Sequence, residues 1–352
     1  MSPLLFRFSN PCVVLPMMLL SLATHAESAS CPAPSSLPQT IRVMQLQGYG
    51  GPEHMQLSSV ALPTPGPNQV LVRMQAASIN PIDWKQREGL VRDWWPLNMP
   101  AILGRDGSGT VVGLGAGTAR VQCGDSVVIL TDSDAQSGSF AEYVVADARW
   151  VAPKPESLSF AEAAAYPLVG ITAWNGLVQT AKVRAGERVL VQGGAGGVGS
   201  MAVQIAKAKG AYVITTASAA NRNFVLALGA DEAIDYRSTR FEDAVQAVDL
   251  VFDTVGGDTL RRSVAVIKPG GRLVSIAGSI AADVCKQAQI ECPADVEGAP
   301  GAGLPELKAL IDAGQLKVHV DAEFPFADLS AAMERNRAGH TRGKIIVNIS
   351  TP

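Results

Sequence analysis

Cysteine and histidine are scarce in this chain, which has five of the first and four of the second among 352 residues. Their scattered positions predict neither a disulfide framework nor a metal-binding cluster. Basic residues are not in excess, because 29 Lys and Arg stand against 32 Asp and Glu, a net charge of −3. A dedicated nucleic-acid-binding protein needs a basic surface that neutralises phosphates, so the composition argues against that class, RNA-binding proteins included.

Long hydrophobic runs are also missing, since no segment beyond the N-terminal region is long and apolar enough to cross a membrane. At the start, one early cation, Arg7, precedes an apolar run over 13–23 and small residues ending at Ala26. This order is typical of a secretory signal peptide, predicted here over 1–26. The protein is then periplasmic or secreted. The alternative is a start codon assigned too far upstream of a cytoplasmic protein. The Pro- and Ser-rich segment 27–40 is predicted to be a linker.

The rest of the chain contains two kinds of sequence. A composition with 47% hydrophobic and 17% charged residues is globular, and the length predicts two domains. Over 41–165, short apolar runs separated by Gly and Pro indicate a β-rich domain of barrel type. Over 166–315, apolar runs alternate with helical patterns, which predicts a parallel, doubly wound sheet. Short runs return over 316–352, so we expect this tail to rejoin the first domain. The runs expected to form strands are Ile41–Leu46, Val70–Met74, Thr110–Gly113, Ser126–Leu130, Phe140–Val145, Arg188–Gln192, Ala211–Thr216, Asp249–Phe252, Arg272–Ile276, Lys317–Val320 and Lys344–Ile349.

The strongest local motif is the segment GGAGGVG at 193–199, which follows an apolar run and precedes a helical pattern. Its spacing fits the dinucleotide-binding fingerprint G-x-G-x-x-G. Glycines let the chain turn sharply and bring backbone N–H groups close to a pyrophosphate, and the helix N-terminus adds about half a positive charge. The sequence therefore predicts a dinucleotide site whose phosphate loop contains Gly194, Gly196, Gly197, Val198 and Gly199.

The choice of dinucleotide follows from a missing carboxylate. No acidic residue occurs between Glu187 and Asp231, where a fold that prefers NAD places Asp or Glu on the ribose 2′-hydroxyl. Ser218 and Arg222 stand there instead, and a hydroxyl and a guanidinium can bind the 2′-phosphate that a carboxylate would repel. We therefore predict NADPH as the cofactor. The alternative is that Arg222 is a solvated helix residue.

Several segments spread in order over residues 41–352 resemble one enzyme family. They are GYGGPE (48–53), INPIDWKQREG (79–89), ILGRDGSG (102–109), GDSVV (124–128), GSFAEYV (138–144), LSFAEAAAYPLVGITAW (158–174), LGADEAIDY (228–236), VFDTVGG (251–257), IKPGGRLVSIAG (267–278) and HTRGKIIV (340–347). Together they are similar to the zinc-free quinone oxidoreductase (zeta-crystallin-like) and alkenal reductase branch of the medium-chain dehydrogenase/reductase superfamily. The resemblance implies an α/β fold, in which a GroES-like catalytic domain packs against a Rossmann NADP-binding domain with the active site in the cleft between them. It is also compatible with a homodimer.

The resemblance also bears on cofactor contacts. Many quinone reductases carry Lys where this sequence has Asn221. The 2′-phosphate contact then rests on Ser218, Arg222 and Tyr236, and the preference for NADPH over NADH is less decided. Asp253, in the VFDTVGG segment, is a further cofactor-binding candidate.

Zinc members of this superfamily hold their catalytic metal with Cys, His and Cys or Asp, the donors that a borderline-soft cation prefers. At the matching positions this sequence has Asn80 and, in place of Gly-His-Glu, the segment 104–106 with Gly-Arg-Asp. We therefore predict a site without metal and reject a zinc alcohol dehydrogenase. Cys285 and Cys292 either form a disulfide, if the protein is exported, or remain two thiols.

The loss of the metal limits the chemistry. Without a Lewis acid a simple carbonyl is hard to reduce, whereas charge developing on a quinone or enone delocalises and needs only a hydrogen-bond donor. The expected reaction is hydride transfer from NADPH to a quinone or to the C=C bond of an α,β-unsaturated carbonyl. The alternative to an enzyme is a protein that binds NADPH but catalyses no reaction.

Four residues are candidates for the substrate side of the site. Lys85 is the expected electrostatic partner and proton donor, and Asn80 is expected to orient substrate or nicotinamide. Asp83 is expected to fix its loop or to pair with a cation such as Arg87. Tyr49 is expected to line the pocket.

Overall fold

The structure, a computed structural model, describes residues 31, 34–131, 137–296, 298–299 and 301–350. The predicted signal peptide lies outside the described residues, as do 27–30 and 32–33 of the predicted linker. Among the described residues, no helix combines the length and the apolar character needed to cross a membrane.

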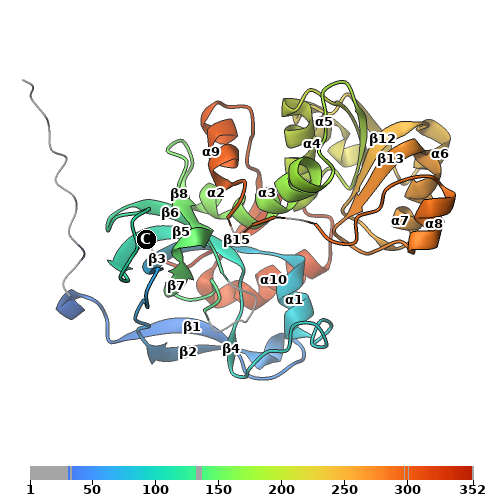
Figure 1. The fold of residues 1–352 in the computed structure, drawn as a ribbon. Coiled ribbons are helices and arrows are strands. Elements are labelled where there is room, and N and C mark those ends of the chain that lie inside the picture. Colours follow the sequence, from blue (N-terminus) through green and yellow to red (C-terminus); the bar gives the residue numbers. More distant parts are fainter. Residues whose placement is uncertain (1–30, 32–33, 132–136, 297, 300, 351–352) are drawn as a thin grey trace, which may run out of the picture.

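One half of the molecule is built from mostly antiparallel sheets (Figure 1). A seven-stranded sheet has the order β14-β15-β3-β5-β6-β8, with β7 pairing to β3, and a three-stranded sheet has the order β2-β1-β4. The C-terminal strand β15 runs antiparallel to β3, so the end of the chain completes the sheet that its first third begins. The strands are β1 Thr40–Leu46, β2 Met55–Ala61, β3 Gln69–Ile79, β4 Ala101–Ile102, β5 Asp106–Leu114, β6 Ser126–Leu130, β7 Tyr143–Asp147, β8 Val151–Pro153, β14 Val320–Pro325 and β15 Lys344–Asn348.

The other half is a five-stranded parallel sheet with the order β11-β10-β9-β12-β13. Its central strands are almost entirely buried because helices cover the sheet, and this is why they are nearly continuous apolar runs in the sequence. The strands are β9 Arg188–Gln192, β10 Tyr212–Ala217, β11 Glu232–Asp235, β12 Val248–Asp253 and β13 Ile267–Ser275.

Ten α-helices lie in the described part of the chain, and their starts follow local sequence. α2 begins with a capping box between Ser159 and Glu162, and α1 begins with Asn80 followed by proline. The helices are α1 Pro81–Arg87, α2 Phe160–Ala164, α3 Pro167–Trp174, α4 Gly197–Ala208, α5 Arg222–Ala227, α6 Phe241–Ala244, α7 Gly257–Ser263, α8 Ala282–Gln287, α9 Leu304–Asp312 and α10 Leu329–Arg337.

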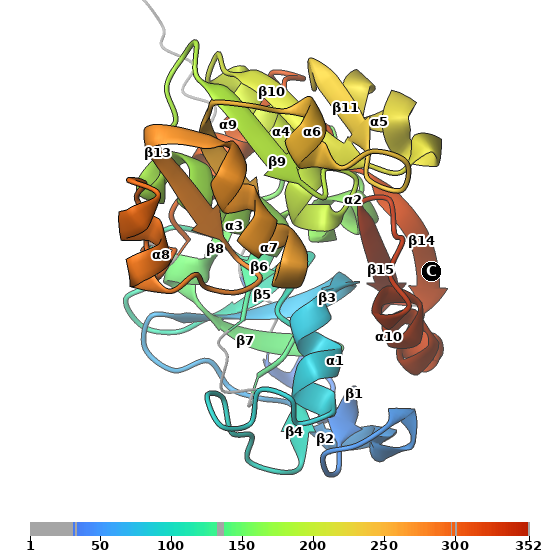
Figure 2. The same ribbon diagram turned by 90° about the vertical axis from the view of Figure 1, so that its right-hand side faces the viewer.

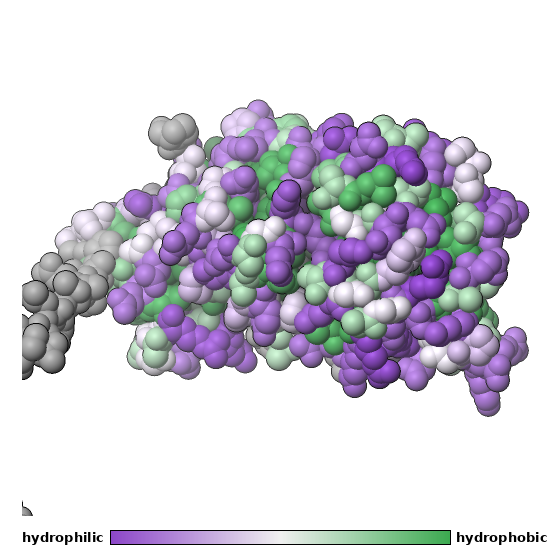
Figure 3. All heavy atoms as spheres, turned by 90° about the horizontal axis from the view of Figure 1, so that it is seen from above, coloured by the Kyte–Doolittle hydropathy of each residue, from purple (hydrophilic) through white to green (hydrophobic). Residues whose placement is uncertain are grey.

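The two halves share a hydrophobic core. Val128 of β6 belongs to one buried cluster with Val169 of α3, Phe252 of β12 and Leu307 of α9. In Figures 1 and 2, α3 lies between the two sheet systems. The apolar side chains therefore hold the two halves in a fixed arrangement. Seen from above (Figure 3), hydrophobic residues on the described surface form small areas separated by hydrophilic ones, as is usual for a water-exposed face.

The predicted α/β fold class, a GroES-like domain with a Rossmann-type parallel sheet, is confirmed. The sequence pattern missed some strands at sheet edges. β2 has a largely exposed sequence, MQLSSVA, in which polar residues interrupt the apolar ones, and β11 has only four residues, so neither forms an apolar run. The strand expected at Lys317–Val320 instead lies over Val320–Pro325.

The expectation that the cysteines are too scattered for a disulfide framework is wrong, and of the two alternatives for Cys285 and Cys292 the structure has the disulfide. Cys31 is disulfide-bonded to Cys123, which lies 92 positions further along the chain in the turn between β5 and β6. A second disulfide joins Cys285 of α8 to Cys292. Because Cys31 is bonded and Thr40 already lies in β1, the last part of the predicted linker is held at both ends.

Candidate active site

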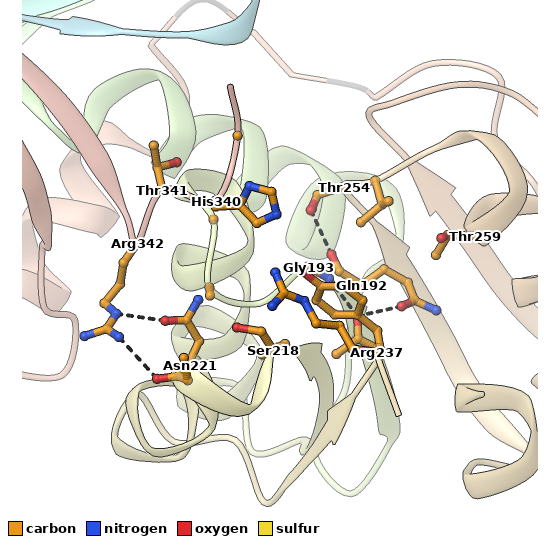
Figure 4. A pocket seen from close by; sticks show the side chains of 18 of the residues that line it. Gln192, Gly193, Ser218, Asn221, Arg237, Thr254, Thr259, His340, Thr341 and Arg342 are labelled. Atoms are coloured by element: carbon orange, nitrogen blue, oxygen red, sulfur yellow. Dashed lines mark hydrogen bonds between the residues drawn. The ribbon is translucent and has the colours of Figure 1, made fainter. Parts of the chain in front are cut away.

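A cavity of about 1140 Å³ opens at the carboxyl ends of the parallel strands (Figure 4). From β9 the chain builds β10 and β11 on one side and then crosses back to build β12 and β13 on the other side of β9, which makes this edge the switch point where such sheets bind ligands. The lining residues come from the ends of these strands, from the segment after β11, and from the C-terminal segment. They are Gln192, Gly193, Ala195, Gly196, Thr216, Ala217, Ser218, Ala220, Asn221, Tyr236, Arg237, Thr239, Phe241, Thr254, Val255, Thr259, Arg262, His319, Asp321, Gly339, His340, Thr341 and Arg342.

The glycine loop forms the floor of this cavity. The backbone N–H of Gly193 donates to Thr216 Oγ1 (3.0 Å), and that hydroxyl donates to Gln192 Oε1 (2.8 Å). Gly196 is the N-cap of α4, so the free N–H groups of the first helical turn begin here. The loop therefore presents a helix N-terminus to the cavity, as an anionic ligand requires.

The predicted loop residues divide into two groups. Gly196 lines the cavity, whereas Gly194, Gly197, Val198 and Gly199 do not belong to its lining. Two of these glycines are required by packing. A Cβ on Gly194 would overlap Thr215 Oγ1, and a Cβ on Gly199 would overlap the carbonyl oxygen of Gly193. These two positions thus set the shape of the loop.

Arg222, predicted to bind the 2′-phosphate, does not line the cavity. Arg222 is exposed at the start of α5 and donates to the carbonyl oxygen of Ala233 (2.8 Å), so it does not line the cavity. Arg342 occupies that part of the wall. Its Nε donates to Asn221 Oδ1 (2.9 Å) and its Nη2 to the carbonyl oxygen of Ala220 (3.2 Å), as the dashed lines of Figure 4 show.

Of the other residues predicted to bind the cofactor, two line the cavity and one does not. Ser218 and Tyr236 line the cavity, and the Arg237 guanidinium lies close to Ser218 in Figure 4. Asp253 is fully buried at the end of β12 and does not line it. Its carboxylate accepts hydrogen bonds from Ser275 Oγ (2.7 Å) and from the backbone N–H of Gly256 (3.0 Å). Asp253 therefore shapes the loop after β12.

Charge in the cavity is mainly positive. Arg237, Arg262 and Arg342 line it, against the single carboxylate of Asp321 among the described lining residues, although the Arg262 guanidinium is paired with Glu242 outside the lining. Burial and the neighbouring Arg342 lower the pKa of His319, so this imidazole is neutral at pH 7. This balance favours an anionic ligand.

A buried polar network lies beneath the start of α1. Asn80 Nδ2 donates to Asp106 Oδ1 (2.8 Å), and Asn80 Oδ1 accepts from Lys344 Nζ (2.6 Å). Asp106 also accepts from Ser78 Oγ (2.5 Å) and from the backbone N–H of Leu168 (3.0 Å). Asn80 is 2% exposed. Both ends of its amide are engaged inside the protein, contrary to the expectation that it orients substrate directly.

Asp83 completes this network. Its Oδ2 accepts from the backbone N–H of Asn80 (2.7 Å) in the capping box of α1, which agrees with the loop-fixing role. Burial raises its pKa to about 7, against the opposing effects of the Asn80 hydrogen bond and of Lys344. The proposed pairing with Arg87 is wrong, because that guanidinium pairs with Glu88 (2.9 Å) and Glu334 (2.7 Å).

The last two catalytic candidates lie away from the cavity wall. The Lys85 ammonium lies over the ring of Trp84 (5.6 Å to the centroid), and the side chain is half-buried. The Tyr49 hydroxyl accepts from the backbone N–H of Leu97 (2.8 Å), so this tyrosine fastens the loop after α1. Neither lines the cavity described above.

Comparison with known proteins identifies the family. Two family models match, an alcohol dehydrogenase GroES-like domain over 66–156 and a zinc-binding dehydrogenase over 228–347. The chain is 34% identical to an NADPH-dependent alkenal/one oxidoreductase of Arabidopsis thaliana, over 97% of this chain and 89% of that protein. The chain belongs to the medium-chain dehydrogenase/reductase superfamily.

Further members of the superfamily show the same likeness. A 2-methylene-furan-3-one reductase of Solanum lycopersicum is 33% identical over 97% of this chain and 87% of its own. The solved quinone oxidoreductase of Coxiella burnetii superposes with a TM-score of 0.79 at 34% identity, covering 88% of this chain and all of that one. These relatives belong to the quinone oxidoreductase and alkenal reductase branch of the superfamily.

Asn80 and the 104–106 segment, which the resemblance sets at the places of zinc ligands, are joined by the hydrogen bond from Asn80 to Asp106. Within the described ranges, no group of three or more His, Cys, Asp and Glu side chains is placed to hold a metal. The donor set at this position therefore consists of an amide, a carboxylate and an ammonium.

Sequence reasoning missed the contribution of the C-terminal segment to the site. Arg342 reaches the cavity wall and Lys344 enters the buried network, although both lie far along the chain from their partners. The segment HTRGKIIV had been recognised as similar to the superfamily, and it was the available signal. When the residues that a motif contacts lie far away in the sequence, the motif alone does not indicate which contacts its side chains make.

Proposed function

We propose that this protein is an NADPH-dependent oxidoreductase that transfers a hydride to a quinone or to the C=C bond of an α,β-unsaturated carbonyl. The observation that carries the proposal is the cavity at the glycine loop, whose wall presents guanidinium groups where an NAD-specific fold presents a carboxylate. The alkenal/one oxidoreductase and the quinone oxidoreductase among its relatives support the reaction class.

The residues of the cavity suit a 2′-phosphorylated dinucleotide. The loop around Gly196 and the start of α4 would hold the pyrophosphate through backbone N–H groups. Ser218, Tyr236 and Arg342 would hold the ribose 2′-phosphate, with Asn221 fixing the guanidinium of Arg342. When bound, the nicotinamide supplies the hydride, and the protein contributes position and electrostatics.

The substrate side would act without metal assistance. Asn80 and Asp83 would act by fixing the start of α1, because the amide of Asn80 is engaged inside the protein and Asp83 Oδ2 accepts from the backbone N–H of Asn80. Lys85, half-buried on the same helix, is the proposed electrostatic partner of the reduced oxygen. A quinone or conjugated enone suits such a site, since its developing charge is spread over the conjugated system and requires only a donor.

The test is NADPH oxidation by the purified chain against a panel of quinones and 2-alkenals. Saturated aldehydes serve as the control substrates, and each reaction is repeated with a chelator. We expect turnover of conjugated substrates only, unchanged by the chelator. Tight NADPH binding without turnover of any panel member would favour the idle binding protein, and one stoichiometric zinc per chain would refute the metal-free site.

We also propose domain limits and a compartment. The limits are a GroES-like domain over 41–165, a Rossmann domain over 166–315 and a returning segment over 316–352. Removal of residues 1–26 would remove Cys12 and leave a mature chain whose four cysteines form the two disulfides. Such a chain suits an oxidising compartment, periplasmic or extracellular. N-terminal sequencing and non-reducing peptide mass spectrometry of the exported protein test this; an intact leader or free thiols would contradict it.

A further inference from the structure

Lys344 is a charged side chain in the interior of the protein. It lies at the start of β15 and is only 4% exposed. Its Nζ donates to Asn80 Oδ1 (2.6 Å) and to the carbonyl oxygen of Ile79 (2.5 Å). A buried ammonium is costly unless such partners satisfy it, so its presence here requires an explanation.

The surroundings of this ammonium are those of a cation site. Two oxygen atoms, from Asn80 and Ile79, accept hydrogen bonds from it directly. Two buried carboxylates, those of Asp106 and Asp83, interact with it electrostatically. Asp106 reaches it through Asn80, whose amide donates to the carboxylate and accepts from the ammonium. Lys344 thus supplies the positive charge in the buried network of Asn80, Asp106 and Asp83.

The backbone beside Lys344 is joined to the glycine loop. The N–H of Gly343 donates to the carbonyl oxygen of Ala195 (3.0 Å), and Gly343 forms a β-bridge with Gly196. A Cβ on Gly197 would come within 3.0 Å of Lys344 Cδ, so the aliphatic part of the lysine packs against the first turn of α4. One residue therefore contacts the phosphate loop with its stem and the start of α1 with its charged end.

We propose that Lys344 is a positioning residue, a built-in cation that fixes the start of α1 against the glycine loop and so aligns the substrate side of the cleft with the cofactor side. This inference rests on the proposed reductase function. Its physical basis is that reactions between bound groups depend steeply on distance, since a displacement of about 1 Å can cost about a hundredfold in rate. The proposed contacts to the cofactor's 2′-phosphate are made by other side chains, those of Ser218, Tyr236 and Arg342.

The experiment compares two variants in the full chain. Lys344→Ala removes the ammonium and leaves a space for a small amine, whereas Lys344→Met removes the charge and keeps the volume filled. Lys317→Ala, an exposed lysine of the same C-terminal segment, is the matched control. Each protein is assayed for melting temperature, for KM of NADPH and for kcat on a conjugated enone, with and without methylammonium chloride. Sodium chloride at equal ionic strength controls for salt.

For Lys344→Ala we expect a lower melting temperature and a kcat reduced by about 10- to 100-fold, while KM for NADPH changes little. Methylammonium should raise both the melting temperature and kcat of this variant. It should restore neither property in Lys344→Met, which fills the space with a methyl group. Lys317→Ala should match the unsubstituted protein throughout.

The inference is overturned if Lys344→Met keeps full kcat, or if methylammonium restores neither the melting temperature nor kcat of Lys344→Ala. If Lys344→Ala does not accumulate as folded protein, the kcat of Lys344→Met alone decides the matter. Failure of the proposed function can be told apart from failure of the inference about Lys344. In that case the unsubstituted chain turns over no panel substrate, and amine rescue of the melting temperature still tests the cation site.

Discussion

Replacing Arg342 by methionine should weaken NADPH binding and leave NADH binding unchanged. Methionine keeps much of the length of the arginine stem and removes only the guanidinium. In the structure Nε and Nη2 of that guanidinium are held by Asn221 and Ala220, which leaves Nη1 without a partner among the described residues. The guanidinium is therefore fixed at the cavity wall, with N–H groups available to a phosphate.

The magnitude follows from the contact that is lost. A hydrogen bond to a charged group contributes about 1.5–3 kcal/mol, which corresponds to about a 10- to 150-fold increase in the Kd of NADPH. NADH lacks the 2′-phosphate and so loses no contact when Arg342 is replaced, and its Kd should change by less than about twofold. The ratio of the two dissociation constants, and not either one alone, reports the guanidinium.

The assay is fluorescence or calorimetric titration of the purified protein with each dinucleotide at two salt concentrations. Arg222→Met is the matched control, because Arg222 is an exposed arginine near the same strand end whose guanidinium bonds to Ala233. We expect its Kd for NADPH to equal that of the unsubstituted protein. A larger loss of NADPH affinity from Arg222→Met than from Arg342→Met would refute the assignment, as would an equal loss of NADH affinity from Arg342→Met.

Three further substitutions test other parts of the structure. Burial raises the pKa of Asp83 to about 7, so the folded state binds a proton more tightly than the unfolded state. The free energy of unfolding should therefore fall, by at most about 1.4 kcal/mol per pH unit, as pH rises from about 4 to 7. Asp83→Asn should flatten this part of the profile in urea titrations, and an unchanged slope would contradict the burial argument. Gly199→Ala places a Cβ against the carbonyl oxygen of Gly193. The substitution should lower the free energy of unfolding by about 1–3 kcal/mol and weaken NADPH binding. Denaturation and NADPH titration measure the two effects, and unsubstituted values of both would exclude the clash. The double variant Cys285→Ser, Cys292→Ser should melt at a lower temperature than the oxidised protein. A reductant should lower its melting temperature by less than that of the unsubstituted protein, because only the Cys31–Cys123 disulfide remains to be reduced; equal melting curves of the variant and the oxidised protein are the contrary result.

Local features of the site were predictable because their causes are adjacent in the sequence. The phosphate loop needs a strand, closely spaced glycines and a helix start, and all of these lie within residues 188–208. The parallel strands were predictable because burial on both faces makes them continuous apolar runs. Ser218 was predictable because it follows the end of a recognisable strand, whereas Tyr236 came from the family resemblance; both line the cavity.

Side-chain partners were less predictable. Asn80 is expected from its motif to orient substrate or nicotinamide, yet both ends of its amide are engaged in a buried network. Asp253 was chosen for the cofactor, and it shapes a loop instead. A polar residue in a motif is compatible with either role, and only the positions of its hydrogen-bond partners distinguish them.

By itself the sequence determined the two kinds of domain, most of the strands, the dinucleotide loop and the family, because each depends on residues close together in the chain or on motifs in a fixed order. Only the tertiary structure decided which arginine lines the cavity and where the buried ammonium lies. Arg342 and Asn221 are 121 positions apart, and Lys344 and Asn80 are 264 apart. The physical reason is that such pairs form when β15 joins the sheet beside β3, a long-range pairing that no local pattern encodes.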